Sequence, residues 1–442
     1  MARQLFGTDG VRGRAGHFLT ADLALSLARA AVLRAGKARP QVLIVRDTRE
    51  SGEMLESAIA AGVTAAGGDA LVAGVLSTPA APLLVRRHGL DLAAVISASH
   101  NPYEDNGIKL FADDGFKLDD DTEHAIEAQL EQPVAAPGRI GRVRRLHGAL
   151  EDYLRELHVR YAALELRGTR VLLDCANGAT FRAAPEIFRR LGAEVTVLAN
   201  QPDGRNINDR CGSTHLELVR EHMSAGAHDV AFAFDGDGDR VLALDRTGAV
   251  VDGDELIALA AIHLSRQHRL PGPGVAVTVM TNYGFHSAMA AAGIEVATTA
   301  VGDRYVLDEL RRRGWALGGE QSGHIIDLGF GPSGDGIASA LLTLEALGGR
   351  DLSERDAMAK LPQRLVNIRA RDRAALAAAL EDAGVKAAIE REDASLRGRG
   401  RVLVRASGTE PLIRVMVEAP TRRETEAVCG RLTEVVEGAV TR

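Results

Sequence analysis

The sequence predicts an α/β protein in which three similar α/β units with mixed sheets precede a smaller C-terminal α+β unit. A chain of 442 residues is too long for one hydrophobic core and should divide into about three or four units. One pattern recurs three times: a short β-branched strand, a polar loop, a helix, then a glycine and a second strand. After about residue 364 this pattern ends. One large doubly wound sheet is the alternative for the repeated part.

The three copies of the pattern occupy successive parts of the chain. In the order strand, helix, second strand, they cover 42–45, 54–66 and 70–72; then 171–173, 182–191 and 192–197; then 275–279, 285–292 and 293–296. The strands consist mostly of apolar residues, as buried strands do. Polar loops at the ends of such strands carry the chemistry in α/β units, so candidate site residues are expected there.

The C-terminal part has a different pattern. An alanine-rich helix is followed by the strand 401–405, a turn, the strand 412–418 and a final helix. The final helix starts with a capping box formed by Thr421 and Glu424. Stretches rich in proline or glycine predict four domains, at 1–154, 155–252, 253–364 and 365–442.

Composition favours a cytoplasmic protein. The formal net charge of −7 and the absence of a long basic run argue against a nucleic-acid partner. The three cysteines follow no metal or disulfide spacing, which fits a reducing compartment. The first residues lack the apolar core of an export signal. The longest uncharged stretch, 70–85, is short and contains two prolines, so no membrane span is expected.

The stretch 234–240, Phe-Asp-Gly-Asp-Gly-Asp-Arg, is the strongest candidate for a metal site. Asp235, Asp237 and Asp239 alternate with glycines, so their carboxylates can turn toward one hard cation such as Mg2+ or Ca2+. Three carboxylates leave room for a phosphate oxygen as a further ligand. An EF-hand would need glycine and glutamate at two positions that arginines occupy here. A solvated acidic turn is the remaining alternative, but it would hold three repelling charges.

Ser99 is the candidate nucleophile. It lies in Ser99-His100-Asn101-Pro102, where an apolar strand breaks into a turn that Pro102 keeps from becoming helical. No Gly-x-Ser-x-Gly elbow is present, so ester or peptide hydrolysis fits poorly. Phosphoryl transfer fits better, because a phosphoserine would complete the cation site. Ser97 is the competing nucleophile, and an ordinary turn is the alternative without chemistry.

Lys109 and Arg12 are further candidates for the same chemistry. Lys109 ends the stretch 106–109, and a lysine desolvated between phosphate and metal could act as a general acid or base. Arg12 lies in the glycine loop 7–13, which can bind an anion. An ordinary surface lysine and a plain turn are the alternatives.

Two later loops combine glycines with polar side chains. The loop 318–324 contains an acid, an amide, a hydroxyl and an imidazole, which suit the hydroxyls of a sugar. The hairpin turn 405–411 and the next strand offer two arginines, two hydroxyls and an exposed backbone amide, which suit a phosphate. A solvated hairpin is the alternative there. The stretch 329–334 matches Gly-x-Gly-x-x-Gly, but no convincing strand with an acidic end follows, which argues against a dinucleotide site.

Four motifs together resemble the α-D-phosphohexomutase superfamily. They are Ser99-His100-Asn101-Pro102, the loop 235–240, Gly319 to His324, and Arg405 to Pro411, in the order and spacing of that superfamily over the whole chain. The resemblance implies four domains, three of a shared α/β type and a mobile fourth, around one central cleft. The subfamily that acts on glucosamine phosphate is similar at four further places: 6–13, 206–208, 211–215 and the glutamine at 321.

The resemblance assigns a role to each matching residue. Ser99 is the phosphoserine, and one Mg2+ per chain is bound by its phosphate together with Asp235, Asp237 and Asp239. Acid/base candidates are Lys109 and His324, with Arg12 and Arg240 near the transferring group. Substrate contacts are expected from His100, Glu320 and Ser322 and, at the distal phosphate, from Arg405, Ser407, Gly408, Thr409 and Arg414.

The activity implied by the resemblance is a mutase reaction. Phospho-Ser99 gives its phosphoryl group to O1 of glucosamine 6-phosphate, and the 1,6-bisphosphate turns over and returns its 6-phosphoryl group to the serine. The product, glucosamine 1-phosphate, would supply UDP-N-acetylglucosamine synthesis. Alternatives are a mutase for glucose or mannose phosphates, a metal-dependent phosphatase, and a Ca2+-binding protein without catalysis. The expected partner is a small-molecule sugar phosphate, with no nucleic acid and no membrane, and a homodimer is allowed.

Overall fold

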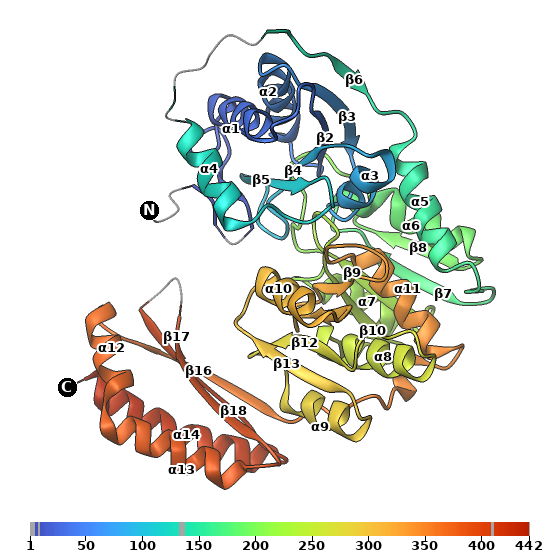
Figure 1. The fold of residues 1–442 in the computed structure, drawn as a ribbon. Helices are drawn as coiled ribbons and strands as arrows, with labels where there is room; N and C mark the ends of the chain where they lie inside the picture. The colour runs from blue at the N-terminus through green and yellow to red at the C-terminus, as the bar shows by residue number, and fades with distance from the viewer. Residues whose placement is uncertain (1–4, 8, 131, 133–137, 408–410, 442) are drawn as a thin grey trace. The chain divides into compact units, whose positions relative to one another are not determined.

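The computed structural model describes residues 5–7, 9–130, 132, 138–407 and 411–441 (Figure 1). The chain forms two compact units. The larger unit comprises Met1–Val279 and Glu295–Arg355, and the C-terminal unit comprises Met280–Ile294 and Asp356–Arg442.

The larger unit contains three sheets. The first, in the order β1-β5-β4-β2-β3-β6, consists of β1 (Val11–Arg14), β2 (Gln41–Arg46), β3 (Asp69–Val75), β4 (Leu92–Ile96), β5 (Asp105–Ala112) and β6 (Val143–Arg145). The second, in the order β11-β10-β9-β7-β8, consists of β7 (Arg170–Asp174), β8 (Glu194–Leu198), β9 (Val230–Phe234), β10 (Val241–Asp245) and β11 (Val250–Val251). The third, in the order β13-β12-β14-β15, consists of β12 (Gly274–Thr278), β13 (Glu295–Thr299), β14 (Leu317–Gly319) and β15 (Ile325–Asp327).

One four-stranded core recurs in these sheets, as β3-β2-β4-β5, β8-β7-β9-β10 and β13-β12-β14-β15. In each copy the first three strands are parallel and the fourth is antiparallel to the third. The prediction of three similar α/β units with mixed sheets is therefore confirmed, and the alternative of one large sheet is wrong. The fourth strand in each copy reverses direction through a short turn, as antiparallel neighbours permit.

Helices cover these sheets. In chain order they are α1 (Ala21–Arg34), α2 (Gly52–Ala65), α3 (Ala80–His88), α4 (Asp120–Leu130), α5 (Ala149–Arg160), η1 (Ala179–Phe181), α6 (Ala183–Arg190), α7 (Glu217–Ser224), α8 (Gly253–Arg266), α10 (Asp303–Arg313), α11 (Gly336–Leu347) and η2 (Leu352–Glu354). A full capping box starts α8, where Asp252 accepts from the Glu255 amide and the Glu255 carboxylate accepts from the Asp252 amide.

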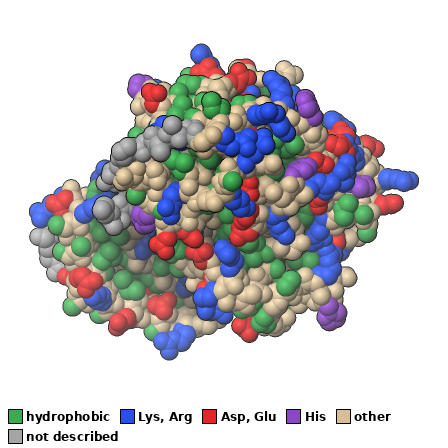
Figure 2. All heavy atoms as spheres, turned by 45° about the horizontal axis from the view of Figure 1, so that its top comes forward, with side chains coloured by type: hydrophobic (Ala, Val, Ile, Leu, Met, Phe, Trp, Pro, Cys, Tyr) green, Lys and Arg blue, Asp and Glu red, His purple; other side chains and the backbone are tan. Residues whose placement is uncertain are grey.

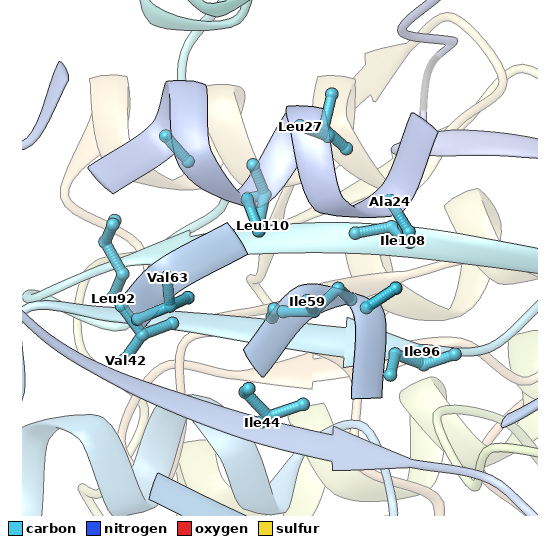
Figure 3. Packing of buried hydrophobic residues seen from close by; sticks show 14 of the residues in the cluster. Ala24, Leu27, Val42, Ile44, Ile59, Val63, Leu92, Ile96, Ile108 and Leu110 are labelled. Carbon is cyan, nitrogen blue, oxygen red and sulfur yellow. The ribbon is translucent and has the colours of Figure 1, made fainter. Parts of the chain in front are cut away.

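The core of the first sheet shows how the sequence pattern becomes packing (Figure 3). Val42 and Ile44 project from β2 toward Ile59 and Val63 of α2, and all four side chains are buried. Alternate residues of β2 share one face because side chains alternate along a strand. Burial of such side chains contributes about 1.5–3 kcal/mol each.

The C-terminal unit is the smaller α+β unit that was predicted. Its antiparallel sheet has the order β16-β18-β17, with β16 (Gln363–Arg369), β17 (Arg401–Ala406) and β18 (Leu412–Glu418). Its helices are α9 (Tyr283–Ala291), α12 (Arg373–Glu381), α13 (Ala383–Leu396) and α14 (Arg422–Val440). Thr421 caps α14 by accepting from the Glu424 amide at 3.2 Å. The assignment of α9 to this unit was not anticipated; Asn282 and Tyr283 hold it there through hydrogen bonds to the Glu418 carboxylate.

Among the described residues, no helix is long and apolar enough to cross a membrane. On the face shown in Figure 2, Lys and Arg side chains are intermingled with Asp and Glu side chains. The domain boundaries expected after residues 154, 252 and 364 stay predictions.

Candidate active site

Three turns at equivalent places in the three repeated cores carry the predicted side chains. The β4–β5 turn holds Ser99, the β9–β10 turn holds the three aspartates, and the β14–β15 turn holds Glu320 and His324. The second and third turns meet through the backbone, where the Val241 amide donates to the Gly323 carbonyl at 3.1 Å. The repeat therefore gathers three loops that are far apart in sequence.

Ser99 is buried at the tip of the first turn, with 1% of its surface exposed. Its Oγ donates a hydrogen bond to Asp235 Oδ2 and lies 3.3 Å from His100 Nδ1. Ser99 has a φ of 52°, in the left-handed region that non-glycine residues rarely adopt. Such backbone strain persists only where the surroundings hold it, and it is found at functional sites.

Arg49 supplies much of that support. It is fully buried and donates to the carbonyls of Ser99 and Asn101 at 3.0 and 2.9 Å, and also to the Pro102 carbonyl. Its Nε donates to Asp47 at 2.9 Å, which balances its charge. One guanidinium thus fixes three carbonyl groups of the turn.

The competing nucleophile, Ser97, has a supporting position. Its Oγ donates to Asp47 and accepts from the Ser99 amide at 3.0 Å, and Ser97 is fully buried. From the second repeat, Asn208 donates to the Ser99 and Asn101 carbonyls, both at 3.0 Å. Ser99, and not Ser97, is therefore the serine that reaches the aspartates.

The three aspartates form a buried cluster that could hold a metal ion. One oxygen from each of Asp235, Asp237 and Asp239 lies within 4.8 Å of the other two. Asp237 Oδ1 is buried and has no hydrogen-bond donor among the described residues, which leaves an acceptor for a cation. The loop is tight: Gly238 has a φ of +75°, and a Cβ there would lie 2.4 Å from Thr180 Cγ2.

Lys109 lies among these carboxylates. Its Nζ is 2.9 Å from Asp237, 3.1 Å from Asp9 and 3.4 Å from Asp239, and only 1% of its side chain is exposed. Burial alone would lower the pKa of Lys109, but the charges of Asp237 and Asp9 outweigh it and raise the pKa. Lys109 is therefore protonated at neutral pH, and the alternative of a plain surface lysine is wrong.

The aspartates differ in how their charge is compensated. Burial, together with the charges of Asp239 and Asp237, raises the pKa of Asp235 well above its usual value. Burial also disfavours the ionised form of Asp239, yet the charges of Lys109 and His324 outweigh it and hold the pKa of Asp239 well below its usual value. A bound cation would stabilise the ionised form of Asp235, whose charge has the least compensation.

A cavity of about 440 Å3 opens beside this cluster. It is lined by Arg12, Arg240, Glu320 and His324, together with Asp239. Its volume lies within the range of small-molecule sites. Ser322 is exposed, and neither Ser322 nor His100 belongs to the lining of this cavity.

The pKa values of two histidines of the site are shifted in opposite directions. Burial and the nearby charges of Arg240 and Arg12 lower the pKa of His100 to about 4, so His100 is neutral at pH 7. Burial opposes the charged form of His324 as well, but Asp239 at 3.6 Å and Asp303 at 3.8 Å raise its pKa. His324 thus lies between two acidic groups, where a proton is held more firmly.

Lys117 links the first and third repeats and was not anticipated from the sequence. It is mostly buried and forms ion pairs with Asp9 and Asp303. Asp9 in turn pairs with Arg12 and with Lys109. This network fixes Arg12, which lines the cavity, and Lys109, which lies among the aspartates.

The predicted phosphate cradle lies in the C-terminal unit. Arg405 and Arg414 are directly opposite each other in the β17–β18 pairing. Burial and the charge of Arg414 lower the pKa of Arg405, and Arg414 Nε is buried without a hydrogen-bond acceptor among the described residues. The Ser407 amide donates to the Leu412 carbonyl at 2.8 Å. Gly408 and Thr409 lie outside the described residues.

Family models described as phosphoglucomutase/phosphomannomutase match four consecutive parts of the chain. Domains I, II and III match residues 3–135, 151–248 and 252–365, and the C-terminal domain matches residues 365–435.

The chain is also similar to curated proteins named phosphoglucosamine mutase. The protein of Moorella thermoacetica is 51% identical over 98% of this chain and 99% of its own length. That of Parafrankia sp. is 46% identical over the full length of both chains.

Solved structures share the fold. A phosphoglucomutase/phosphomannomutase family protein of Burkholderia thailandensis has a TM-score of 0.80 at 23% identity, over 98% of this chain and 97% of that one. The N-acetylphosphoglucosamine mutase of Aspergillus fumigatus, solved with GlcNAc-6P and magnesium, has a TM-score of 0.69 at 18% identity, over 99% and 96%.

Proposed function

The chain belongs to the phosphoglucomutase/phosphomannomutase family and, within it, to the phosphoglucosamine mutases, and we propose that it interconverts glucosamine 6-phosphate and glucosamine 1-phosphate. The observation that carries this proposal is the identity of 51% to a phosphoglucosamine mutase over 98% of the chain. The geometry supports it, because Ser99 reaches the aspartate cluster beside a cavity lined by two arginines.

In the proposed reaction Ser99 carries the phosphoryl group. The bond between phosphorus and Ser99 Oγ breaks as phosphorus bonds to O1 of glucosamine 6-phosphate. The O1 hydroxyl gives its proton to an acid/base group of the chain, and Ser99 Oγ takes up a proton. The 1,6-bisphosphate then turns over and returns its 6-phosphoryl group to Ser99. Fixing the turn by Arg49 and Asn208 favours transfer, because the reacting oxygen is already oriented.

Asp235, Asp237 and Asp239 fit Mg2+, since Mg2+ prefers oxygen ligands and the cluster offers an orphaned carboxylate oxygen. Bound there, together with the phosphate of Ser99, Mg2+ would neutralise charge on the transferring group. Arg12 and Arg240 line the same cavity and would bind the transferring phosphoryl oxygens.

The proton is moved by groups of the chain. Lys109 is protonated at neutral pH, so it serves as the acid when Ser99 Oγ leaves and accepts the proton back in the return step. His324 is the second candidate, because it is buried between Asp239 and Asp303 and lines the cavity.

The proposal also assigns residues to substrate recognition. Glu320 lines the cavity and would accept from sugar hydroxyls, with His100 and Ser322 as further contacts. Arg405 and Arg414 would bind the phosphate that is not being transferred, with Ser407, Gly408 and Thr409 as its neighbours in the turn. Because these groups would bind whichever phosphate is not reacting, one site can serve both half-reactions.

The cellular compartment, the partner and the oligomeric state are further parts of the proposal. The three cysteines are buried and unpaired, which supports the cytoplasm as the compartment. A small-molecule sugar phosphate is the proposed partner, without nucleic acid or membrane, and a homodimer is compatible with the chain.

A phosphorus NMR time course tests the activity. The protein is mixed with Mg2+, a trace of hexose 1,6-bisphosphate and, in separate samples, the 6-phosphates of glucosamine, glucose and mannose. We expect the signal to move to the anomeric phosphate fastest with glucosamine. A faster reaction with glucose or mannose would keep the mechanism and overturn the sugar assignment. Accumulation of inorganic phosphate alone would identify a phosphatase.

A further inference from the structure

A second cleft, of about 840 Å3, opens elsewhere on the larger unit. It lies among the end of β3, the start of α5 and α6, and it shares no lining residue with the cavity beside Ser99. Figure 1 shows α5 and α6 side by side, with β3 in the neighbouring sheet. The mutase reaction proposed above does not use this cleft.

Positive charge dominates the lining. Five arginines face the cleft: Arg46, Arg145, Arg182, Arg189 and Arg190. The cleft has two carboxylates, those of Glu151 and Glu186. Each forms an ion pair with Arg190 at 2.8 Å. The cleft is therefore electropositive in a chain whose formal net charge is −7.

Three of these arginines lack an acidic partner. Arg145, Arg182 and Arg189 are exposed, and none has a carboxylate at ion-pair distance among the residues that the structure describes. Arg46, by contrast, is 2.9 Å from Glu53. Guanidinium groups without a carboxylate keep their donors available for an anion, and their planar fork matches a phosphate.

The backbone adds donors at the same place. The first turn of α5, residues 149–151, lines the cleft, and its N-cap Gly148 offers no side-chain acceptor. The N-cap of α6 is Arg182, which likewise makes no side-chain cap. The free N–H groups and the positive end of a helix favour a negatively charged ligand.

The remaining lining suits the organic part of a small molecule. Phe181, Leu146 and Leu154 supply apolar surface, and the volume lies within the range of small-ligand sites. We propose that this cleft is a second ligand site, which binds a small organic molecule bearing one or more phosphate groups.

Both walls of the cleft continue into the active site. Arg46 precedes Asp47, which holds Ser97, and Leu76 is two residues from Thr78, whose Oγ1 donates to Asp237 at 2.6 Å. On the other wall, Phe181 is two residues from Ala179, whose amide donates to the Gly236 carbonyl at 2.8 Å.

A ligand that shifts either wall would act on the Ser99 turn or on the aspartate loop. We infer that a cleft ligand regulates turnover; this second part rests on the proposed mutase activity, whereas binding to the cleft does not.

Isothermal titration of the full-length protein with inorganic pyrophosphate, at fixed ionic strength and without Mg2+, tests the site. The variant Arg145→Ala/Arg182→Ala/Arg189→Ala should lose one class of binding site, with affinity reduced at least about 10-fold, since it removes three donors of charge-assisted hydrogen bonds. Arg220→Ala, in exposed α7 outside the cleft, is the matched control and should titrate like the wild type.

Arg12→Ala/Arg240→Ala identifies pyrophosphate bound in the catalytic cavity, because it should lose only the other class. The triple Arg→Lys variant should retain part of the cleft binding, since it keeps the charge but not the fork. If the triple alanine variant and the control titrate alike, the cleft is not an anion site and the proposal fails.

Turnover measured with and without pyrophosphate tests regulation. The triple variant should keep its basal rate and lose the part of the pyrophosphate response that depends on the cleft, whereas Arg220→Ala should respond like the wild type. An identical response in both proteins would overturn the regulatory part alone. Absence of mutase activity in the wild type and in Arg220→Ala, with cleft binding intact in both, would instead overturn the proposed function.

Discussion

The surroundings of Ser99 and the β17–β18 hairpin both collect charged side chains, but they balance that charge in opposite ways. Around Ser99, Lys109 lies within 3.4 Å of three carboxylates and is almost fully buried. In the hairpin, Arg405 and Arg414 are cross-strand partners of like charge, and burial together with the charge of Arg414 lowers the pKa of Arg405.

The difference indicates where each region obtains its order. Charges that compensate one another inside the protein fix a geometry before any substrate arrives, as catalytic preorganisation requires. Like charges placed side by side lower their energy when an anion binds between them. Substitutions near Ser99 should therefore reduce kcat, whereas substitutions in the hairpin should raise KM.

The largest effect on turnover is expected for Asp237→Ala. It removes a metal ligand and the partner of both Lys109 and Thr78, so kcat should fall by at least about 10³-fold. The fold should persist, because the change relieves repulsion among three carboxylates. Phosphorus NMR measures turnover, circular dichroism measures the fold, and Glu221→Ala on exposed α7 is the control. Wild-type Mg2+-dependent activity in Asp237→Ala would show that the aspartate loop is wrongly assigned.

Arg49→Lys should have the next largest effect. Lysine keeps the charge beside Asp47, but its three N–H donors share one nitrogen and cannot make all four contacts of Arg49, to Asp47 and to three carbonyls, so Ser99 loses its fixed orientation. We expect kcat to fall by about 10²-fold with little change in KM, because a displacement of about 1 Å has that consequence. Steady-state kinetics of Arg49→Lys, with Arg220→Lys as the control, measures kcat and KM separately. A change confined to KM would mean that Arg49 binds substrate and does not position Ser99.

Arg405→Ala should have a smaller effect, and this effect should be on KM. Loss of one guanidinium should raise KM about 10-fold to 100-fold, in line with about 1.5–3 kcal/mol for a charge-assisted hydrogen bond. Stability should not fall, since Arg414 is relieved of a like charge. Arg423→Ala, exposed on α14 of the same unit, is the control for kinetics and urea unfolding. An unchanged KM would remove the hairpin from the binding site.

The sequence predicted the repeated α/β pattern and the loops at its strand ends, because both rest on local features. Alternating side chains, glycines and apolar runs predict the strands. Asp235, Asp237 and Asp239 lie within one stretch of seven residues. The sequence analysis did not predict that the three turns that carry the site residues occupy equivalent places in the three cores. It depends on the fourth strand of each core, which the strand–helix–strand pattern did not include.

The supporting residues were missed because their partners are distant in sequence. Arg49 contacts a turn 50 residues away, and Lys117 pairs with Asp303 across 186 residues. A fully buried arginine is rare without a partner, yet burial cannot be read from a single polar residue. The available signal was Asp47-Thr48-Arg49, a polar run directly after an apolar strand.

The smallest effect on turnover is expected for Asp335→Asn, which tests a buried acid that has no lysine beside it. Asp335 caps α11 and accepts from Tyr153 Oη at 2.9 and 3.0 Å, and burial raises its pKa to about 6. A raised pKa means that the folded state holds the proton more firmly than the unfolded state does. The stabilisation is complete below the unfolded pKa of 3.8 and is lost as the pH rises through about 6.

Between pH 5 and pH 7, the wild-type free energy of unfolding should therefore fall by about 1 kcal/mol relative to Asp335→Asn, which does not titrate. Urea unfolding of both proteins at several pH values measures this difference, and kcat of the two should agree within about twofold because Asp335 lies outside the lining of the catalytic cavity. Parallel pH profiles would show that Asp335 is ionised throughout this range. Its charge would then be stabilised by the Tyr153 hydroxyl and the Ala338 amide alone, without the cation that Lys109 supplies around Ser99.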